Sequence, residues 1–263
     1  MSPATRNSAI ADAPLFQPTE LIMGMPITVA IPAAECTNPD ENADLVFALF
    51  RSVDLQFSPY KTESEVSRID RGELVPGDVS PQMQEVLRLS EDTKRLTNGF
   101  FDVWFNGRFD PSGLVKGWSI LKAARLLDAQ GIENYCIDAG GDIEIRGYEA
   151  PETPWKIGLR NPFDPVTIIR TLALTNRGIA TSGTYIRGEH IYNPRNGEKA
   201  NSIASITVVA PNVYEADRLA TAAFAMGEAG VEFIASIPTC DAYMVDKSGT
   251  ATYTPGFARY IAS

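Results

Sequence analysis

The spacing of hydrophobic and polar positions divides the chain into a helical first part and a strand-rich second part. Apolar residues near helical spacing predict amphipathic helices over 39–56, 81–96 and 113–130. A β-branched run over 20–32 predicts one buried strand before them. Further strands are predicted near 135–139, 142–147, 155–160, 168–174, 178–183 and 203–210, then helices over 215–226 and 228–235 and a hairpin over 243–254.

Helices and strands that follow one another in blocks, without strict alternation, indicate an α+β fold. We expect a mixed or mostly antiparallel sheet with packed helices. Residues 1–18 are polar and rich in Ala and Pro, which predicts a loose N-terminal segment. A chain that is 44% hydrophobic can form one large core or two closely packed subdomains. Because no flexible linker interrupts the chain, we expect residues 19–263 to form a single domain.

Composition narrows the classes of partner. A formal net charge of −10 disfavours binding to nucleic acid or to an anionic membrane. A phosphate-bearing ligand would need local compensation from a metal ion, a lysine or backbone amides. The first twenty residues contain no uninterrupted apolar run, so we expect neither a signal peptide nor membrane insertion, and a cytoplasmic location.

The segment Asp110-Pro-Ser-Gly-Leu-Val-Lys-Gly-Trp118 combines an acid, two glycines and a lysine around a predicted helix start. This combination can gather backbone groups and a cation around a phosphate. It is not a P-loop, because Gly113 lies three residues before Lys116 and no Ser or Thr follows that lysine. Spacing alone favours a structural interpretation, with a turn at Asp110, a helix cap at Ser112 and a solvated Lys116.

Two further places carry candidate chemistry. Asp217 and Thr221 are four residues apart on a predicted helix, where a carboxylate and a hydroxyl could share a hard cation. The alternative is a solvated Asp217 and a half-buried Thr221. His190 is the only histidine, in a polar loop, and is either a surface side chain or a general base with an ordinary pKa near ~6.5.

Glycine-rich segments and aromatic residues suggest the walls of a pocket. Residues 138–143 and 180–185 place glycines between or at the ends of strands, where a ligand can approach the backbone. Each segment could equally be a simple turn. Tyr60, Phe101 and Trp104 could stack on a planar ring or belong to the core.

Taken in order, eight segments resemble the ApbE family of FAD:protein FMN transferases. Each segment is a weak signal alone, but their shared order along nearly the whole chain is specific. The segments are MGM at 23–25, FSPYKTESEVSRID at 57–70, GFFD at 99–102, DPSGLVKG at 110–117, GGDI at 140–143, ATSGTY at 180–185, HIYNPRNG at 190–197 and ADRLATA at 216–222.

The resemblance implies a magnesium-dependent enzyme that cleaves FAD, transfers FMN to a Thr or Ser hydroxyl of an acceptor protein with a flavinylation motif, and releases AMP. It implies that FAD lies in a cleft between the helical and sheet-rich parts. The implied metal ligands are the Gly113 carbonyl, Asp217 and Thr221, and the implied catalytic residues are His190, as base, and Asp217. The implied FAD-binding residues are Met23, Tyr60, Phe100, Phe101, Asp102, Asp110, Lys116 and Ile191.

The chain departs from the family pattern after the histidine. The usual Asp-Pro-x-Thr-Gly is Asn193-Pro-Arg-Asn196-Gly here. Two alternative functions therefore stay open beside FMN transfer. One is hydrolysis of FAD to FMN and AMP, and the other is FAD binding without turnover.

Overall fold

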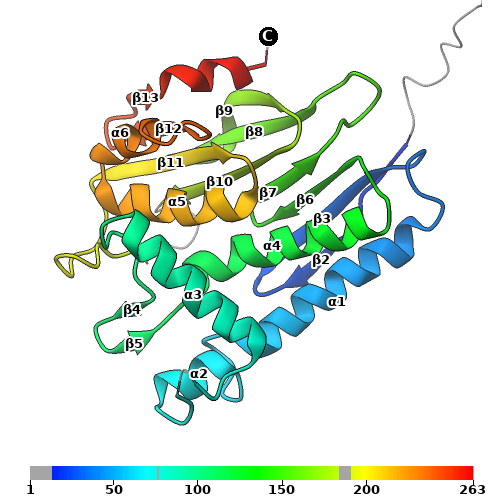
Figure 1. Cartoon of the computed structure of the whole chain (residues 1–263). Coiled ribbons are helices and arrows are strands. Elements are labelled where there is room, and N and C mark those ends of the chain that lie inside the picture. Colours follow the sequence, from blue (N-terminus) through cyan, green and yellow to red (C-terminus); the bar gives the residue numbers. More distant parts are fainter. Residues whose placement is uncertain (1–13, 76, 184–190, 263) are drawn as a thin grey trace, which may run out of the picture.

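A nine-stranded sheet runs through the middle of the computed structural model, which describes residues 14–75, 77–183 and 191–262 (Figure 1). Its strand order is β1-β3-β6-β7-β10-β11-β12-β13, with β2 also paired to β3, and every pairing is antiparallel. The strands are β1 (Leu15–Phe16), β2 (Thr19–Ile22), β3 (Met25–Pro32), β6 (Tyr135–Ala139), β7 (Asp142–Arg146), β10 (Arg177–Gly183), β11 (Ile203–Ala210), β12 (Asp241–Asp246) and β13 (Ala251–Tyr253).

Helices cover one face of this sheet (Figure 1). They are α1 (Pro39–Phe57), α4 (Ser112–Ala129), α5 (Val213–Met226) and α6 (Ala229–Ala235), with α2 (Glu65–Asp70) and α3 (Pro81–Leu96) packed beside them. Apolar side chains of α1 and α4 meet those of β3 and β6 in one core cluster. Side chains of α5 and α6 meet β10, β11 and β12 in a second. Burial of these apolar faces is the main force that holds the helices on the sheet.

The opposite face of the sheet is covered by a hairpin and the C-terminal segment. The hairpin consists of β8 (Trp155–Asn161) and β9 (Asp164–Leu174), and the C-terminal segment includes the 3-10 helix η2 (Pro255–Tyr260). Trp155, Leu172 and Phe257 are buried here against sheet residues such as Ile145 and Val209. The sheet is therefore a middle layer with a core on each side.

Most predicted elements are confirmed, and their ends follow local chemistry. The Ser80 hydroxyl accepts the Met83 N–H at the start of α3, and Asn212 accepts the Glu215 N–H at the start of α5. These side chains satisfy donors that a helix start leaves without an internal partner. The α+β class and the antiparallel sheet agree with the expectation from the sequence.

One local prediction is wrong. The single strand expected over 20–32 is the hairpin β2–β3, because Met23 and Gly24 both adopt positive φ and turn the chain. The structure also contains short elements that were not predicted. The region after α1 includes the short helix α2, which the Ser64 hydroxyl caps. The aromatic segment near residue 104 includes a small hairpin of β4 (Trp104–Phe105) and β5 (Arg108–Phe109).

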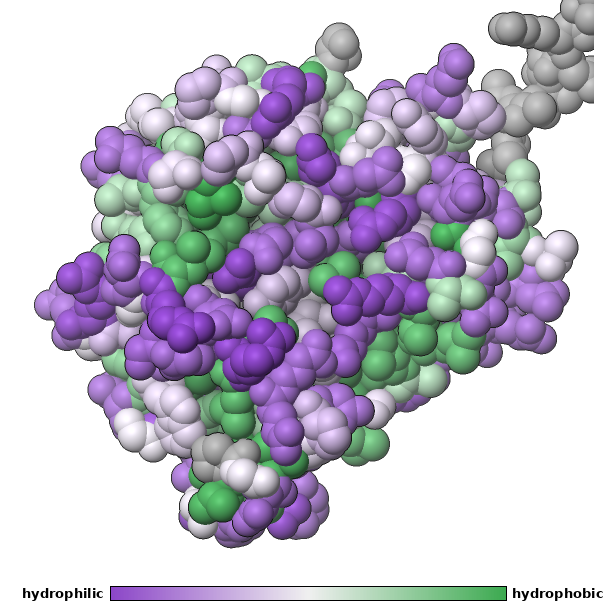
Figure 2. Space-filling model, in the orientation of Figure 1, coloured by the Kyte–Doolittle hydropathy of each residue, from purple (hydrophilic) through white to green (hydrophobic). Residues whose placement is uncertain are grey.

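The N-terminal segment is only partly within the described residues. Leu15 and Phe16 pair with β3, whereas residues 1–13 lie outside the described ranges. In the part of the chain that the structure describes, no helix has both the length and the apolar character to cross a membrane. The face shown in Figure 2 is mostly hydrophilic, with hydrophobic residues in small groups. The cytoplasmic location stays a prediction.

Candidate functional site

A cavity of about 560 Å³ opens where helical and strand segments converge. Its walls come from the α2 region, the loop after α3, the start of α4, the end of β10, the segment after residue 190, and α5. Such a volume lies in the range of small-molecule sites. Because these walls are far apart in sequence, the complete fold is needed to assemble the cavity.

Helices α4 and α5 pack closely against each other at the cavity wall. Gly113 of α4 faces Thr221 of α5, and Gly117 of α4 faces Asp217 of α5. In each helix the two residues are four positions apart and therefore lie on the same face. A Cβ atom on Gly113 would lie 3.3 Å from Thr221 Cγ2, and one on Gly117 would lie 2.7 Å from Asp217 Cβ. The Gly117 N–H donates to Asp217 Oδ2 at 2.7 Å. The absence of side chains on these glycines brings the main chain of α4 against the polar side chains of α5.

Lys116 joins this arrangement through a buried carboxylate. Its ammonium forms an ion pair with Asp142 at the start of β7, and the Asp142 side chain is almost fully buried. The other oxygen of Asp142, Oδ1, accepts the Thr181 N–H of β10 at 3.2 Å. Lys116, Thr181 and Asp217 line the cavity, whereas Asp142 lies behind them. One carboxylate thus contacts groups on α4 and β10.

The local charge favours binding of a cation. Asp217 is 5% exposed, and its pKa is raised to about 8 by burial and by the negative charge of Asp142. Lys116 and the Gly117 N–H oppose this rise but do not cancel it. A cation near Asp217 would lower its pKa again by stabilising the ionised form. A cation bound here would therefore stabilise Asp217 as a carboxylate, whereas burial beside Asp142 otherwise favours its protonated form.

The available ligand set suits a hard cation rather than a soft transition metal. Among the described residues, no group of three or more His, Cys, Asp or Glu side chains is placed to hold a metal ion. Asp217, Thr221 and Gly113 offer a carboxylate, a hydroxyl and a carbonyl at the same wall of the cavity. Oxygen ligands of this kind fit Mg²⁺, which uses few protein ligands and completes its shell with water or substrate oxygens.

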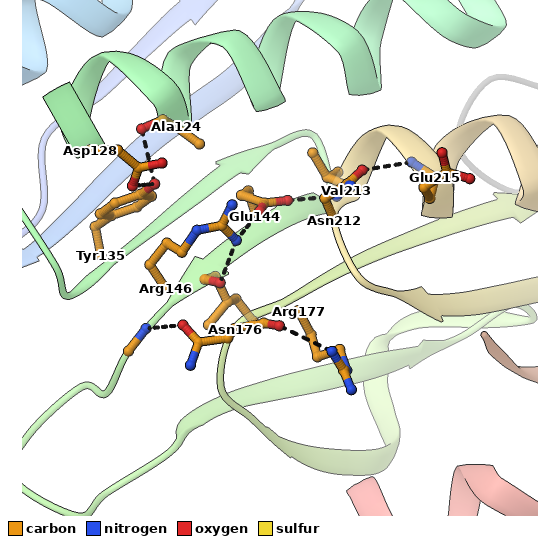
Figure 3. Close-up of polar contacts among 12 residues, drawn as sticks. Ala124, Asp128, Tyr135, Glu144, Arg146, Asn176, Arg177, Asn212, Val213 and Glu215 are labelled. Carbon is orange, nitrogen blue, oxygen red and sulfur yellow. Dashed lines mark hydrogen bonds and ion pairs between the residues drawn. The ribbon is translucent and has the colours of Figure 1, made fainter. Parts of the chain in front are cut away.

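A second buried carboxylate on β7 fixes the start of α5 (Figure 3). Glu144 is fully buried, accepts the Val213 N–H at 2.5 Å and forms an ion pair with Arg146. Burial raises the pKa of Glu144 to about 7, although Arg146 and the Val213 N–H favour its charged form. A carboxylate at a helix N-terminus is stabilised by the free N–H groups there. Glu144 thereby helps to set the position of the helix that carries Asp217.

Aromatic side chains surround the mouth of the cavity. Phe105 and Tyr192 stack with ring centroids 4.9 Å apart, and they join the β4–β5 hairpin to the segment after residue 190. The Arg195 guanidinium lies 4.8 Å from the centroid of the Phe100 ring. Tyr60, also at the mouth, is 95% exposed. These rings offer flat apolar surfaces to a planar ligand.

The structure brings ten of the residues implied by the family resemblance to this one cavity. They are Tyr60, Phe100, Phe101, Asp102, Asp110, Gly113, Lys116, Ile191, Asp217 and Thr221. Met23 is at the β2–β3 turn, where it packs against core residues and is not among those that line the cavity. His190 lies outside the described residues.

Several of these side chains also have structural partners. Asp110 accepts the Ser112 N–H at 2.9 Å, so the turn expected at Asp110 is present. Asp102 forms a 2.7 Å ion pair with Lys94 of α3 and accepts the Trp104 N–H at 3.0 Å. Such contacts hold the two carboxylates at the rim of the cavity before any ligand binds.

Two details expected from the sequence are wrong. Ser112 does not cap α4, because it is the first helical residue and Pro111 occupies the cap position without a side-chain hydrogen bond. Lys116 is not solvated, because it pairs with Asp142. Trp104 packs on Phe109 and is not among the lining residues, whereas its neighbour Phe105 is.

Asp142 and Tyr192 lie in segments singled out from the sequence, but the sequence indicated no individual role for either residue. Asp142 follows two glycines at a strand start, which is also the pattern of an ordinary turn. The sequence does show that Asp142 and Glu144 are two residues apart in a predicted strand, so their side chains lie on the same face of that strand. The glycine segments 138–143 and 180–185 do contribute to the wall, through Gly140 and through Thr181, Ser182 and Gly183.

Comparison with known proteins gives a consistent result at the level of the family. The model of the ApbE family matches residues 23–107 and 104–244. A protein of Vibrio cholerae named FAD:protein FMN transferase is 32% identical over 164 residues, which cover 59% of this chain and 48% of that protein. The aligned part of the chain thus spans about half the length of the first relatives it matches.

Solved structures share the fold along nearly the whole chain. The ApbE protein of Thermotoga maritima superposes with a TM-score of 0.84 at 21% identity, covering 95% of this chain and 100% of that one. The flavin transferase ApbE of Vibrio cholerae gives a TM-score of 0.80 at 22% identity, covering 94% and 99%. At these identities the similarity establishes the fold.

Proposed function

The chain belongs to the ApbE family, and we propose on that premise that it transfers the FMN moiety of FAD to a Thr or Ser hydroxyl of an acceptor protein and releases AMP. One observation carries the proposal. One cavity is lined by the residues that the family resemblance implies for the diphosphate and the cation, which are Gly113, Lys116, Asp217 and Thr221. The relatives named FAD:protein FMN transferase support the same reaction.

The reaction is a phosphoryl transfer. The acceptor hydroxyl oxygen forms a bond to the phosphorus on the FMN side of the diphosphate, and the bond from that phosphorus to the AMP oxygen breaks. The hydroxyl proton passes to a base, and AMP leaves with the bonding electron pair. Negative charge accumulates on the diphosphate oxygens during this step, so fixed positive charge near them lowers the barrier.

Lys116 and a magnesium ion are the proposed sources of that positive charge. Asp217, Thr221 and the Gly113 carbonyl would hold the ion, and the fact that these three oxygen-bearing residues line one cavity supports this assignment. When bound, the ion would neutralise charge on the diphosphate and on the departing AMP. Lys116 is held at the wall by Asp142 and would contact the diphosphate from the α4 side.

The remaining residues would orient FAD and its acceptor. We assign FAD binding to the cavity between the helical and sheet-rich parts, with Tyr60, Phe100, Phe101, Asp102, Asp110 and Ile191 at its walls. Met23 would act from behind the wall, through the turn it forms. His190 is the proposed base for the acceptor hydroxyl, because its ordinary pKa suits proton abstraction near neutral pH.

A direct assay tests the proposal. The protein is incubated with FAD, Mg²⁺ and an acceptor protein that presents an acid followed by Ser-Gly-Ala-Thr, and both AMP and acid-stable protein-bound flavin are measured. We expect the two products in equal amounts, and neither after chelation of the metal. AMP formed at the same rate without acceptor would instead indicate FAD hydrolysis, and retention of FAD without AMP would indicate a binding protein.

Asp217→Asn is the variant that links the activity to the cavity. It keeps the size of the side chain but removes the charge that would hold the cation, so we expect turnover to fall by about 10²-fold or more. Asp241→Asn is the matched control, because Asp241 is a buried aspartate that pairs with Arg259 and Thr254 away from the cavity. Equal loss in both variants would argue against the assignment.

A further inference from the structure

We propose that Asp142 is a positioning residue of this site, which holds the Lys116 ammonium at the cavity wall and keeps it from neutralising Asp217. The inference rests on the proposed function, since it explains how one lysine and one metal-binding carboxylate coexist in the same cavity. Asp142 is not assigned a contact with FAD or metal, because it lies behind the lining residues.

Asp142 is held rigidly by its surroundings. The residue is 1% exposed and begins β7, which is paired on both sides, to β6 and β10. Its Oδ1 accepts the Thr181 N–H at 3.2 Å, which leaves Oδ2 directed at Lys116. A carboxylate held by a central strand and by a neighbouring backbone group is a fixed anchor.

Lys116 has a flexible side chain. A lysine ammonium is a point charge on a four-carbon stem, so its position depends on its partners. Lys116 lies near the start of α4, lines the cavity, and has a side chain that is 18% exposed. The ion pair with Asp142 therefore contributes to holding this positive charge at the cavity wall.

Two carboxylates lie near the Lys116 ammonium. Asp142 pairs with it directly, whereas Asp217 accepts the N–H of the next residue, Gly117, and lines the same cavity as Lys116. If Asp142 lost its charge, Asp217 would become the available buried partner for the ammonium. Lys116 would then occupy the carboxylate that the cation needs. Asp142 thus keeps Lys116 and the cation on separate carboxylates.

The test compares Asp142→Asn with Asp142→Glu. The amide retains the shape and can still accept the Thr181 N–H, but it cannot form an ion pair. We expect kcat to fall by about 10- to 100-fold, as for other residues that support a metal site. The Kd for FAD should change by less than about threefold, because ground-state binding is spread over the whole cavity. Asp142→Glu should recover part of kcat, and Asp241→Asn should leave kcat unchanged.

A double-mutant cycle tests whether Asp142 acts through Lys116. If it does, Asp142→Asn should cost little more once Lys116→Gln is present, because the ammonium that it positions is gone. We expect the double variant to match Lys116→Gln within about twofold. Independent losses that multiply would overturn the inference. So would an Asp142→Glu variant that folds but is as inactive as Asp142→Asn.

A readout that needs no turnover separates this inference from the proposed function. Crystal structures of the wild type and of Asp142→Asn should show the Lys116 Nζ displaced from the cavity wall toward Asp217 in the variant. Isothermal titration with Mg²⁺ and FAD should show weaker cation binding in the variant. An unmoved Lys116 overturns the inference even if the wild type transfers FMN. A wild type without transferase activity overturns the proposed function, and the displacement of Lys116 still decides the role of Asp142.

Discussion

The main-chain N–H of Gly117 donates a 2.7 Å hydrogen bond to Asp217 Oδ2, and the two residues are 100 positions apart in the sequence. The contact needs a glycine, since any Cβ at position 117 would lie 2.7 Å from Asp217 Cβ and 2.9 Å from the Val213 carbonyl oxygen. Real Cβ contacts are longer than this, and a backbone carbonyl cannot swing away as the end of a side chain can. The position of the candidate metal-binding carboxylate is therefore set by the backbone of the neighbouring helix.

The substitution Gly117→Ala should destabilise the protein, although alanine favours a helix. Helix propensity alone would add about 1 kcal/mol of stability. Overpacking against Asp217 and Val213 should cost about 1–3 kcal/mol and exceed that gain, and it should also move Asp217. Urea unfolding measures the first effect and the FMN-transfer assay the second. Gly77→Ala is the control, because a Cβ there meets no atom within 4 Å.

The hydroxyl of Thr221 should be required for the response to magnesium. Thr221→Val has nearly the same shape but lacks the oxygen, so we expect the Mg²⁺ concentration for half-maximal activity to rise about tenfold or more. Thr221→Ser keeps the oxygen and should stay within about threefold of the wild type. A Val variant with an unchanged Mg²⁺ response would remove Thr221 from the proposed ligand set.

Glu144 should make stability depend on pH. Its pKa is about 7 in the folded protein against 4.5 as the ordinary value. Between these pH values the folded state keeps a proton that the unfolded chain has lost, so the free energy of unfolding falls as pH rises through this window and levels off above pH 7. The contribution of Glu144 to this fall is on the order of 3 kcal/mol.

The variant Glu144→Gln isolates that contribution, because glutamine does not titrate. Urea unfolding at pH 5 and pH 8 should show that the stability deficit of the variant relative to the wild type is smaller at pH 8. Glu91→Gln serves as the control, since Glu91 is an exposed residue of α3. A deficit for Glu144→Gln that is the same at both pH values would contradict the burial argument.

The stacked pair at the cavity mouth should contribute to FAD affinity. Removing the ring in Tyr192→Ala abolishes the contact with Phe105 and frees the β4–β5 hairpin from the segment after residue 190. We expect FAD to bind about three- to tenfold more weakly, which corresponds to an aromatic pair worth about 0.5–1.5 kcal/mol. Quenching of flavin fluorescence measures the affinity. Tyr148→Ala, which removes a similarly exposed tyrosine outside the cavity wall, should have no effect.

The sequence predicted the long helices well because their apolar positions repeat over many residues. Helix α3, for example, also has a serine cap and a proline at its start. The β2–β3 hairpin was missed because its turn residues, Met23 and Gly24, lie inside a continuous apolar run. Helix α2 was missed because six residues are too few to show a periodic pattern.

The candidate site was predicted in parts rather than as a whole. Asp217 and Thr221 have a helical spacing that is visible in the sequence, and the ordered motifs related them to Gly113 and Lys116. The partnership of Lys116 with Asp142 has no such signal, because it depends on how α4 crosses β7 in space. The tight approach of Gly117 to Asp217 is equally a result of tertiary packing.

The separation of Gly117 and Asp217 along the chain also has a consequence for protein synthesis. The cavity receives residues from the region of Tyr60 and from as far along the chain as Thr221. Contacts between such distant segments form late, because a long loop must close before they yield any stabilisation. On the ribosome, the nascent chain can therefore assemble the wall of this cavity formed by Gly113, Asp217 and Thr221 only after α5 has emerged.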